Sequence, residues 1–367
     1  ISVMDIYTGD VIAMYSSPSY DPNKFLFGIS NDDWALIRNN PLKPLINKTL
    51  SGLYSPGSTI KPIVALSALE NKIVSPNFKV KCTGKMELYG QTFHCWKEKG
   101  HGFMSLKNAM KQSCDTYFYE VARLLGVDRL KVTAEKFGLG KKVLGDYFDY
   151  EKSGLFPNTK WKKNNLGKGW VLGETLITGI GQGYTQTTPL QLCLMTAQIA
   201  NGGYSIKPRI VVNNNPMSLE EAKSKLQEET LHGQEKKLFK DHKNIKIIQE
   251  AMFSSTNELY GTSYKSRIDN PKYQFAGKTG TAQVKRISMR ERELDLKIEQ
   301  IPYKDRDHAL FVAYGPYVNP RYALSIIVEH GGSGSRTAAP IAKELFKLII
   351  DRDKLRNKQK NFEEIDI

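Results

Sequence analysis

The sequence predicts an α+β fold in which one sheet is built from both ends of the chain and a helical subdomain lies between them. Two patterns favour this fold. Strand-like segments occupy residues 1–15 and return from residue 278, whereas apolar residues with helical spacing dominate residues 58–200. A length of 367 residues, of which 40% are apolar, is that of a packed protein with one large domain or two ordinary ones.

The N-terminal segment is predicted to form a β-hairpin. Residues 1–6 and 11–15 are strand-like and flank a turn-like Tyr-Thr-Gly-Asp sequence. Residues 16–48 are crowded with Pro, Asn, Asp and Ser, so we expect irregular structure there. Because the chain starts with Ile and not with an initiator Met, we expect it to be part of a longer protein.

Five segments carry apolar residues three and four positions apart, which is the spacing of one helix face. The first two end at a glycine, and the third opens with a Thr-Pro-Leu-Gln capping box. The five faces are Phe118, Val121, Ala122 and Leu125; Leu130, Ala134 and Phe137; Leu190, Leu194 and Ala197; Ile245, Ile248 and Met252; and Ile341, Leu345 and Leu348.

The last third of the chain returns to strands. Residues 278–284, 309–314 and 323–329 are strand-like, and the closing helical face follows them. Residues 285–306 are highly charged and are predicted to be a mobile loop, and residues 213–244 are predicted to be a polar surface excursion.

The charge and the cysteine count exclude some classes of protein. The chain has 53 Lys and Arg against 38 Asp and Glu, a net charge of +15, which is compatible with a nucleic-acid partner. The lysines are spread along the whole chain without an aromatic-and-basic signature, so we expect solvated surface charge and no nucleic-acid binding. Four cysteines are too few for a disulfide-stapled scaffold.

The first chemical motif is Ser-x-x-Lys at Ser58 and Lys61, directly after a Pro-Gly turn. We expect Ser58 in the first turn of a helix, where free backbone N–H groups favour developing negative charge. Lys61 lies three residues on, so both side chains share one face, and a desolvated lysine can accept the proton of a serine. The ordinary alternative is a helix start with a surface lysine.

The second motif is Ser113-Cys114-Asp115, just before a predicted helix. Ser113 is a candidate proton relay, and Asp115 is a candidate hydrogen-bond acceptor. The alternative is a simple N-cap, because Ser and Asp are preferred at that position whatever the chemistry.

The third motif is Lys278-Thr279-Gly280-Thr281 on a strand. Gly280 lets a ligand approach the strand backbone, Lys278 and the two hydroxyl groups can bind a carboxylate, and a strand-edge N–H can serve an oxyanion hole. The alternative is an ordinary exposed strand.

Together, and in this order, the three motifs form the signature of serine acyltransferases such as penicillin-binding proteins and β-lactamases. The chain resembles most closely the transpeptidase domain of class B penicillin-binding proteins of the elongation type. One departure is Asp115, where the wider superfamily usually has Asn and this subgroup often has Asp. The stretches that carry the resemblance are residues 3–5, 16–22, 51–58, 96, 100–102, 113–119, 179–184 and 278–284.

The resemblance implies a five-stranded antiparallel sheet sandwiched by helices, with residues 1–367 forming one transpeptidase domain. It also implies a reaction on peptidoglycan stem peptides that needs no cofactor. Ser58 attacks the penultimate D-Ala, Lys61 is the base, and the Ser58 and Thr281 N–H groups form the oxyanion hole. A neutral Lys61 is expected because of the nearby charge of Lys278. β-Lactam antibiotics would acylate Ser58.

The same resemblance implies a longer protein with an N-terminal membrane anchor and a pedestal, both outside this chain. The domain itself would lie in the bacterial periplasm, at the inner membrane. A membrane glycosyltransferase and an elongation scaffold protein are the expected partners.

A metal site is predicted beside the second motif, at Cys82, Cys95, His101 and Cys114. Three thiolates and one imidazole complete a tetrahedral structural zinc site. The resemblance supports zinc, because some members of the subgroup bind it at matching positions. A Cys82–Cys95 disulfide and inert buried thiols are the alternatives.

Two other functions remain open on the same scaffold. A β-lactamase or D,D-carboxypeptidase would hydrolyse the acyl-enzyme, and a β-lactamase needs a base for the deacylating water. Glu174 is interpreted as structural rather than as that base. A β-lactam sensor would use acylation as a signal, without turnover.

Overall fold

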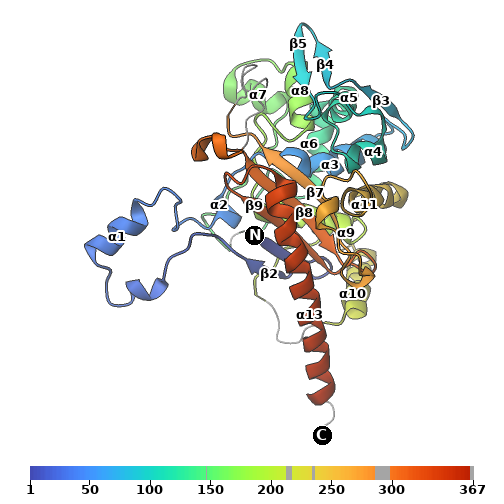
Figure 1. Ribbon diagram of the computed structural model, residues 1–367. Coiled ribbons are helices and arrows are strands. Elements are labelled where there is room, and N and C mark those ends of the chain that lie inside the picture. The colour runs from blue at the N-terminus through green and yellow to red at the C-terminus, as the bar shows by residue number, and fades with distance from the viewer. Residues whose placement is uncertain (146, 212–216, 234–235, 286–297, 364–367) are drawn as a thin grey trace.

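One antiparallel sheet of five strands, formed from both ends of the chain, organises the molecule (Figure 1). The computed structural model describes residues 1–145, 147–211, 217–233, 236–285 and 298–363. The strand order is β2-β1-β9-β8-β7, and every neighbouring pair is antiparallel. This confirms the predicted α+β class. The strands are β1 (Ser2–Asp5), β2 (Val11–Met14), β7 (Ala276–Ala282), β8 (His308–Gly315) and β9 (Tyr322–Val328).

The alternation of side chains along the central strand β8 builds two apolar cores. Leu310 and Val312 pack in the larger core, which the sheet shares with the helical part of the chain. Phe311 and Ala313 pack on the opposite face against α13 (Ala339–Glu363), where Phe346 stacks on Phe275, the residue before β7. The sheet is therefore sandwiched between helices.

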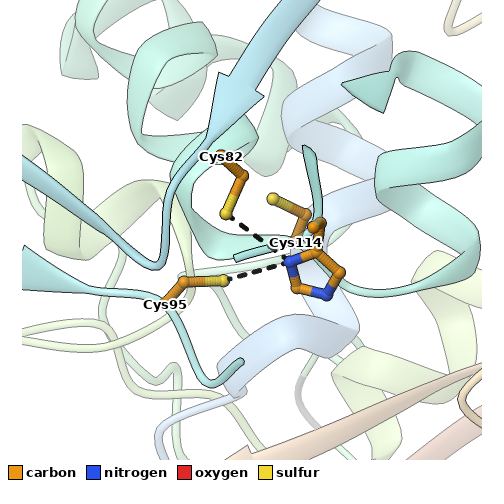
Figure 2. A group of neighbouring side chains, drawn as sticks. Cys82, Cys95 and Cys114 are labelled. Atoms are coloured by element: carbon orange, nitrogen blue, oxygen red, sulfur yellow. Dashed lines mark hydrogen bonds between the residues drawn. The ribbon is translucent and has the colours of Figure 1, made fainter. Parts of the chain in front are cut away.

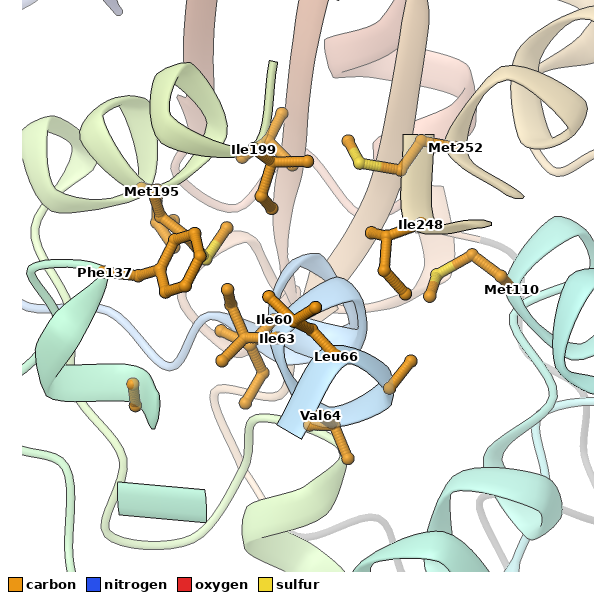
Figure 3. Close-up of a cluster of buried hydrophobic side chains, with 14 of the residues drawn as sticks. Ile60, Ile63, Val64, Leu66, Met110, Phe137, Met195, Ile199, Ile248 and Met252 are labelled. Carbon is orange, nitrogen blue, oxygen red and sulfur yellow. The ribbon is translucent and has the colours of Figure 1, made fainter. Parts of the chain in front are cut away.

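Helix α3 (Lys61–Glu70) lies at the centre of the larger core. Nine of its ten residues are buried, so it is enclosed on all sides, as a central helix should be. Figure 3 shows Ile63 of α3 in a buried cluster with Met195 and Ile199 of α9 (Pro189–Ala200) and Ile248 and Met252 of α11 (His242–Asn257). Because α3 follows Ser58 directly, this packing fixes the position of that residue.

The remaining helices surround this core or lie at its edges. Among the described residues, no helix is both long and apolar enough to cross a membrane. They are α1 (Asn31–Arg38), α2 (Lys48–Ser51), α4 (Leu106–Lys111), α5 (Asp115–Leu125), α6 (Val127–Lys136), α7 (Thr159–Leu166), α8 (Leu172–Gly179) and α10 (Leu219–Leu231).

The predicted elements agree with the structure except in three places. Helix α1 lies within residues 16–48, which were expected to be irregular, because the Ser30 hydroxyl accepts a hydrogen bond from the Asp33 N–H at 3.1 Å and caps it. Helix α10 lies in the predicted polar excursion and buries Ala222 and Leu226. Of the charged loop at 285–306, residues 286–297 lie outside the described residues.

The third difference is a set of short strands inside the predicted helical region. β3 (Lys79–Cys82) pairs with β6 (Gly102–Ser105), and β4 (Lys85–Leu88) pairs with β5 (Gln91–His94). Each strand has four residues, which is too short for a periodic pattern to be visible in the sequence. Cys82 ends β3, Cys95 follows β5 and His101 precedes β6, so these strands position three of the four residues of the cysteine cluster described below.

Candidate active site

Ser58 lies in a single 3₁₀ turn, η2 (Gly57–Ile60), that leads into α3. Gly57 has φ +53°, and a Cβ atom there would lie 2.5 Å from the Thr281 carbonyl oxygen. Glycine therefore lets the turn pack directly against strand β7. Ser58 is half-buried, and its hydroxyl forms no hydrogen bond with any residue that the structure describes.

Lys61 is completely buried, and its amino group is directed at the second motif. Its Nζ lies 2.7 Å from Asp115 Oδ1, 3.0 Å from the Ser113 carbonyl oxygen and 3.3 Å from Ser113 Oγ. These three contacts match the three N–H donors of an ammonium group. The structure therefore places Lys61 in an ion pair with Asp115, whereas the sequence analysis expected a neutral lysine facing Ser58.

Ser113 and Asp115 are held by contacts other than helix capping. Helix α5 begins at Asp115, and the N-cap residue Cys114 makes no side-chain cap bond, so the N-cap alternative is wrong. Ser113 has φ +56°, which turns its hydroxyl and its carbonyl group toward Lys61. Asp115 Oδ2 accepts a hydrogen bond from the Trp96 N–H at 3.0 Å.

Lys278 approaches the same serine from strand β7. Its Nζ lies 2.8 Å from Ser113 Oγ and 3.0 Å from the Thr279 carbonyl oxygen. Burial, together with the positive charge of Lys61, lowers the pKa of Lys278 well below its ordinary value. Lys278 has no exposed surface, so the alternative of an ordinary exposed strand is wrong.

The rest of the third motif lies along the edge of β7. Gly280 packs so closely on the turn of Ser58 that a Cβ atom there would lie 2.7 Å from Thr59 Cγ2. Thr279 is buried and donates a hydrogen bond to Thr262 Oγ1 at 2.8 Å, while Thr281 is exposed. The three motifs therefore meet between η2, the start of α5 and the edge of the sheet.

Two residues without a predicted role also contact this site. The Trp96 indole N–H donates to the Ser113 carbonyl oxygen at 3.1 Å, so this side chain braces the second motif. Gln182 Nε2 donates to the Thr281 carbonyl oxygen at 3.0 Å. Both belong to stretches that carry the resemblance, but only the folded chain shows what their side chains contact.

The predicted cysteine cluster is formed in the structure (Figure 2). One potential ligand atom of each of Cys82, Cys95, His101 and Cys114 lies within 4.8 Å of the others. His101 Nδ1 lies 3.6 Å from Cys82 Sγ and 3.5 Å from Cys95 Sγ. A tetrahedral zinc ion with ordinary bond lengths would hold such a nitrogen and sulfur about 3.6 Å apart. The four side chains therefore fit a structural zinc ion.

The structure also bears on the two alternatives to zinc, a Cys82–Cys95 disulfide and inert buried thiols. All four cysteines of the chain are free thiols in the structure, so no Cys82–Cys95 disulfide is present. Cys193 lies completely buried on α9, away from the cluster, as expected for a core residue. A hydrogen bond with Cys114 lowers the pKa of the Cys95 thiol, and this contact favours a thiolate in the cluster.

Glu174 has a structural environment, as its interpretation from the sequence proposed. Its Oε1 lies 2.5 Å from Lys162 Nζ, and its Oε2 accepts a hydrogen bond from the Val171 N–H at 2.9 Å. Both carboxylate oxygens are thus engaged at the start of α8, so Glu174 is not placed as a base for deacylation.

Comparison with known families identifies the same scaffold. Residues 1–347 match the penicillin binding protein transpeptidase domain. The chain is 36% identical over 354 residues to the peptidoglycan D,D-transpeptidase MrdA of Salmonella typhimurium, and 35% identical over 354 residues to that of Escherichia coli. These matches cover 96% of the chain but only 55% and 53% of the relatives, so the chain spans about half their length.

Two solved structures show the same architecture. PBP2 of Pseudomonas aeruginosa in complex with WCK 5153 is 38% identical, with a TM-score of 0.77 over 93% of this chain and 69% of that one. PBP2 of Helicobacter pylori in complex with MreC is 31% identical, with a TM-score of 0.81 over 95% of this chain and 59% of that one.

Proposed function

The chain belongs to the penicillin-binding protein transpeptidase domain family, and from this premise we propose that it is the catalytic domain of a peptidoglycan D,D-transpeptidase. One observation carries the proposal. Ser113 Oγ lies within hydrogen-bonding distance of the amino groups of both Lys61 and Lys278, so residues from all three motifs surround one proton-carrying hydroxyl.

In the acylation step, Ser58 Oγ attacks the carbonyl carbon of the penultimate D-Ala of a stem peptide. The C–N bond breaks, and the terminal D-Ala leaves with the proton that Ser58 loses. Lys61 accepts that proton. Because the nitrogen of an ammonium group has no lone pair, Lys61 must first release a proton, and Asp115 Oδ1 at 2.7 Å is the nearest acceptor.

Ser113 relays a proton to the leaving amine. Its Oγ accepts hydrogen bonds from Lys61 and Lys278, which leaves its own O–H free to donate. In the second half-reaction, an amine of a neighbouring stem peptide attacks the acyl-enzyme. The new C–N bond replaces the ester to Ser58, and a cross-link forms.

The edge of strand β7 binds the substrate. Lys278, Thr279 and Thr281 recognise the terminal carboxylate, with Gly280 allowing close approach to the strand backbone. The N–H groups of Ser58 and Thr281 form the oxyanion hole, where a single donor is worth about 3 kcal/mol of barrier. A β-lactam uses the same contacts and acylates Ser58.

Cys82, Cys95, His101 and Cys114 would hold a structural zinc ion beside this site. When bound, the ion would crosslink the segments that carry these residues and would take no part in the acyl transfer. Cys114 lies between Ser113 and Asp115, and Trp96 follows Cys95. Residues that would bind the metal are thus covalent neighbours of Ser113 and Asp115, which contact Lys61, and of Trp96, which contacts both of them.

In the cell, the domain is proposed to lie in the periplasm, anchored to the inner membrane by a segment outside this chain. An elongation scaffold protein and a membrane glycosyltransferase are the proposed partners. The H. pylori relative forms a complex with MreC, and a relative 29% identical belongs to a peptidoglycan synthase complex. These relatives support the proposal.

A direct test supplies a stem pentapeptide ending in D-Ala-D-Ala together with an acceptor amine. The proposal predicts release of D-Ala and formation of the cross-linked peptide, with neither product from Ser58→Ala. Release of D-Ala with only the hydrolysed tetrapeptide would instead indicate a carboxypeptidase. Release of D-Ala by Ser58→Ala would overturn the assignment of the nucleophile.

A further inference from the structure

A glutamine side chain contacts the one strand on which the proposed oxyanion hole depends. Gln182 follows α8, and its Nε2 lies 3.0 Å from the Thr281 carbonyl oxygen. Gln182 is not among the residues that carry out the proposed acyl transfer. The effect of its contact depends on the position of β7 at the edge of the sheet.

Strand β7 is at the edge of the sheet, and among the described residues β8 is its one neighbouring strand. The N–H and C=O groups of one residue project to the same side of a strand, and residues two apart project alike. The Thr279 carbonyl oxygen accepts from Lys278 Nζ, and the Thr281 carbonyl oxygen accepts from Gln182. Both carbonyl groups therefore face away from β8, and so does the Thr281 N–H.

The donor end of this contact is anchored on a helix. The Gln182 backbone N–H donates to the Ile177 carbonyl oxygen of α8 at 3.1 Å. The Gly181 carbonyl oxygen accepts from the Gly57 N–H at 2.9 Å, which ties the same loop to the turn that carries Ser58. A Cβ atom at Gly181 would lie 2.1 Å from the Gly57 carbonyl oxygen, so the two loops are in direct backbone contact.

We propose that Gln182 is a positioning residue for acyl transfer, whose side-chain amide holds the Thr281 carbonyl group and, through it, the backbone of Thr281, so that the Thr281 N–H stays aligned with that of Ser58. Without this donor, the Thr281 carbonyl group loses this hydrogen bond, and the end of β7 is held less rigidly, by its pairing with β8. An oxyanion hole works by holding its donors in place before charge develops, so a looser donor lowers the rate of the chemical step. This inference rests on the proposed function and adds a residue to its machinery.

The test measures acylation of the full chain by a chromogenic β-lactam over a range of concentrations, which separates the binding constant K′ from the acylation rate constant k2. Gln182→Glu keeps the size of the side chain but presents a carboxylate to the carbonyl oxygen, and Gln182→Met keeps the length but has no donor. In both variants k2 is expected to fall on the order of tenfold, with K′ within twofold of wild type. Gln227→Glu, an exposed glutamine on α10, is the matched control and leaves both constants unchanged.

The melting temperature of each variant distinguishes positioning from support of the fold. A positioning role predicts an unchanged melting temperature with a lower k2. If both variants melt lower but acylate at the wild-type k2, or if K′ rises while k2 is unchanged, the inference is wrong. Acylation failing in the wild-type chain would instead overturn the proposed function, so the two failures are distinguishable.

Discussion

Lys61 Nζ lies 2.7 Å from Asp115 Oδ1, and the Lys61 side chain is fully buried. The amino group that is proposed to accept the proton of Ser58 is thus paired with a carboxylate in the free protein. A hydrogen bond between Lys61 and Ser58 is therefore not formed before the substrate binds, which is common for catalytic groups in substrate-free proteins. The pairing explains why this chain carries Asp at position 115: the aspartate neutralises a buried charge and is a nearby acceptor for the proton that Lys61 must release.

Asp115→Ala should destabilise the protein strongly, because it leaves the buried Lys61 charge without a partner. We expect a loss of about 3–5 kcal/mol in the free energy of unfolding. Asp115→Asn also removes the partner charge but keeps an oxygen that accepts a hydrogen bond from Lys61, so it should cost less than Asp115→Ala. Urea denaturation measures both values.

The matched control is Asp269→Asn, which removes an ion pair with Arg267 from a side chain that is 82% exposed. Exposed pairs contribute about 0–1 kcal/mol, so this variant should resemble wild type. Equal losses for Asp115→Ala and Asp269→Asn would contradict the role given to Asp115.

The pH dependence of acylation should report the charge of Lys278. Burial and the charge of Lys61 lower the pKa of Lys278, so its positive charge is lost as the pH rises through a value well below 10.5. Because that charge binds the carboxylate of a penicillin, k2/K′ should fall on the alkaline side with a midpoint below 10.5. A penicillin methyl ester, which has no carboxylate, should not show this fall. An alkaline limb centred at or above 10.5 would refute the lowered pKa.

Gly57→Ala should slow acylation and lower stability. The new Cβ atom would lie 2.5 Å from the Thr281 carbonyl oxygen, so either the turn of Ser58 or strand β7 must shift. Gly167→Ala is the control, because Gly167 also has a positive φ, +63°, but no atom lies within 4 Å of its added Cβ. The control should cost about 1–2 kcal/mol of stability from the backbone conformation alone and leave acylation unchanged. Equal acylation rates in the two variants would contradict the account of Gly57.

The zinc proposal predicts about one zinc ion per chain in protein purified without chelator, measured by elemental mass spectrometry. Cys82→Ser should lose the metal and lower the melting temperature, because a structural zinc site contributes to folding. Acylation should slow as well, since Cys114 lies between Ser113 and Asp115.

The control for the metal is Cys193→Ala, which removes a buried thiol outside the cluster. Its zinc content should equal that of wild type, even where the cavity lowers the melting temperature. Metal-free wild-type protein whose melting temperature does not change with chelator would rule out the structural ion.

Much of the fold was predictable because its long elements carry clear periodic patterns. Phe118 and Leu125 mark one face of α5, and the capping box at Thr188 marks the start of α9. Helix α1 was missed because it buries no residue among those the structure describes, so its sequence shows no apolar face. The Ser30 cap with Asp32 and Asp33 in the first turn was its available signal.

The site was predictable to the level of residues but not of contacts. The motifs pointed to Lys61, Ser113 and Lys278, whose side chains are in contact in the structure, and to Ser58, whose turn packs on β7. The pairing of Lys61 with Asp115 and the contact of Gln182 with Thr281 depend on side-chain directions that arise only from tertiary packing. Sequence spacing alone carries no information on such directions.

The most direct test of the central claim is intact-mass spectrometry of this chain after incubation with benzylpenicillin. The account predicts that the chain gains the mass of one benzylpenicillin molecule, that peptide mapping places it on Ser58, and that Ser58→Ala gains none. A wild-type chain that stays at its original mass, or a Ser58→Ala chain that gains the adduct, would contradict the claim that Ser58 is the acylated nucleophile.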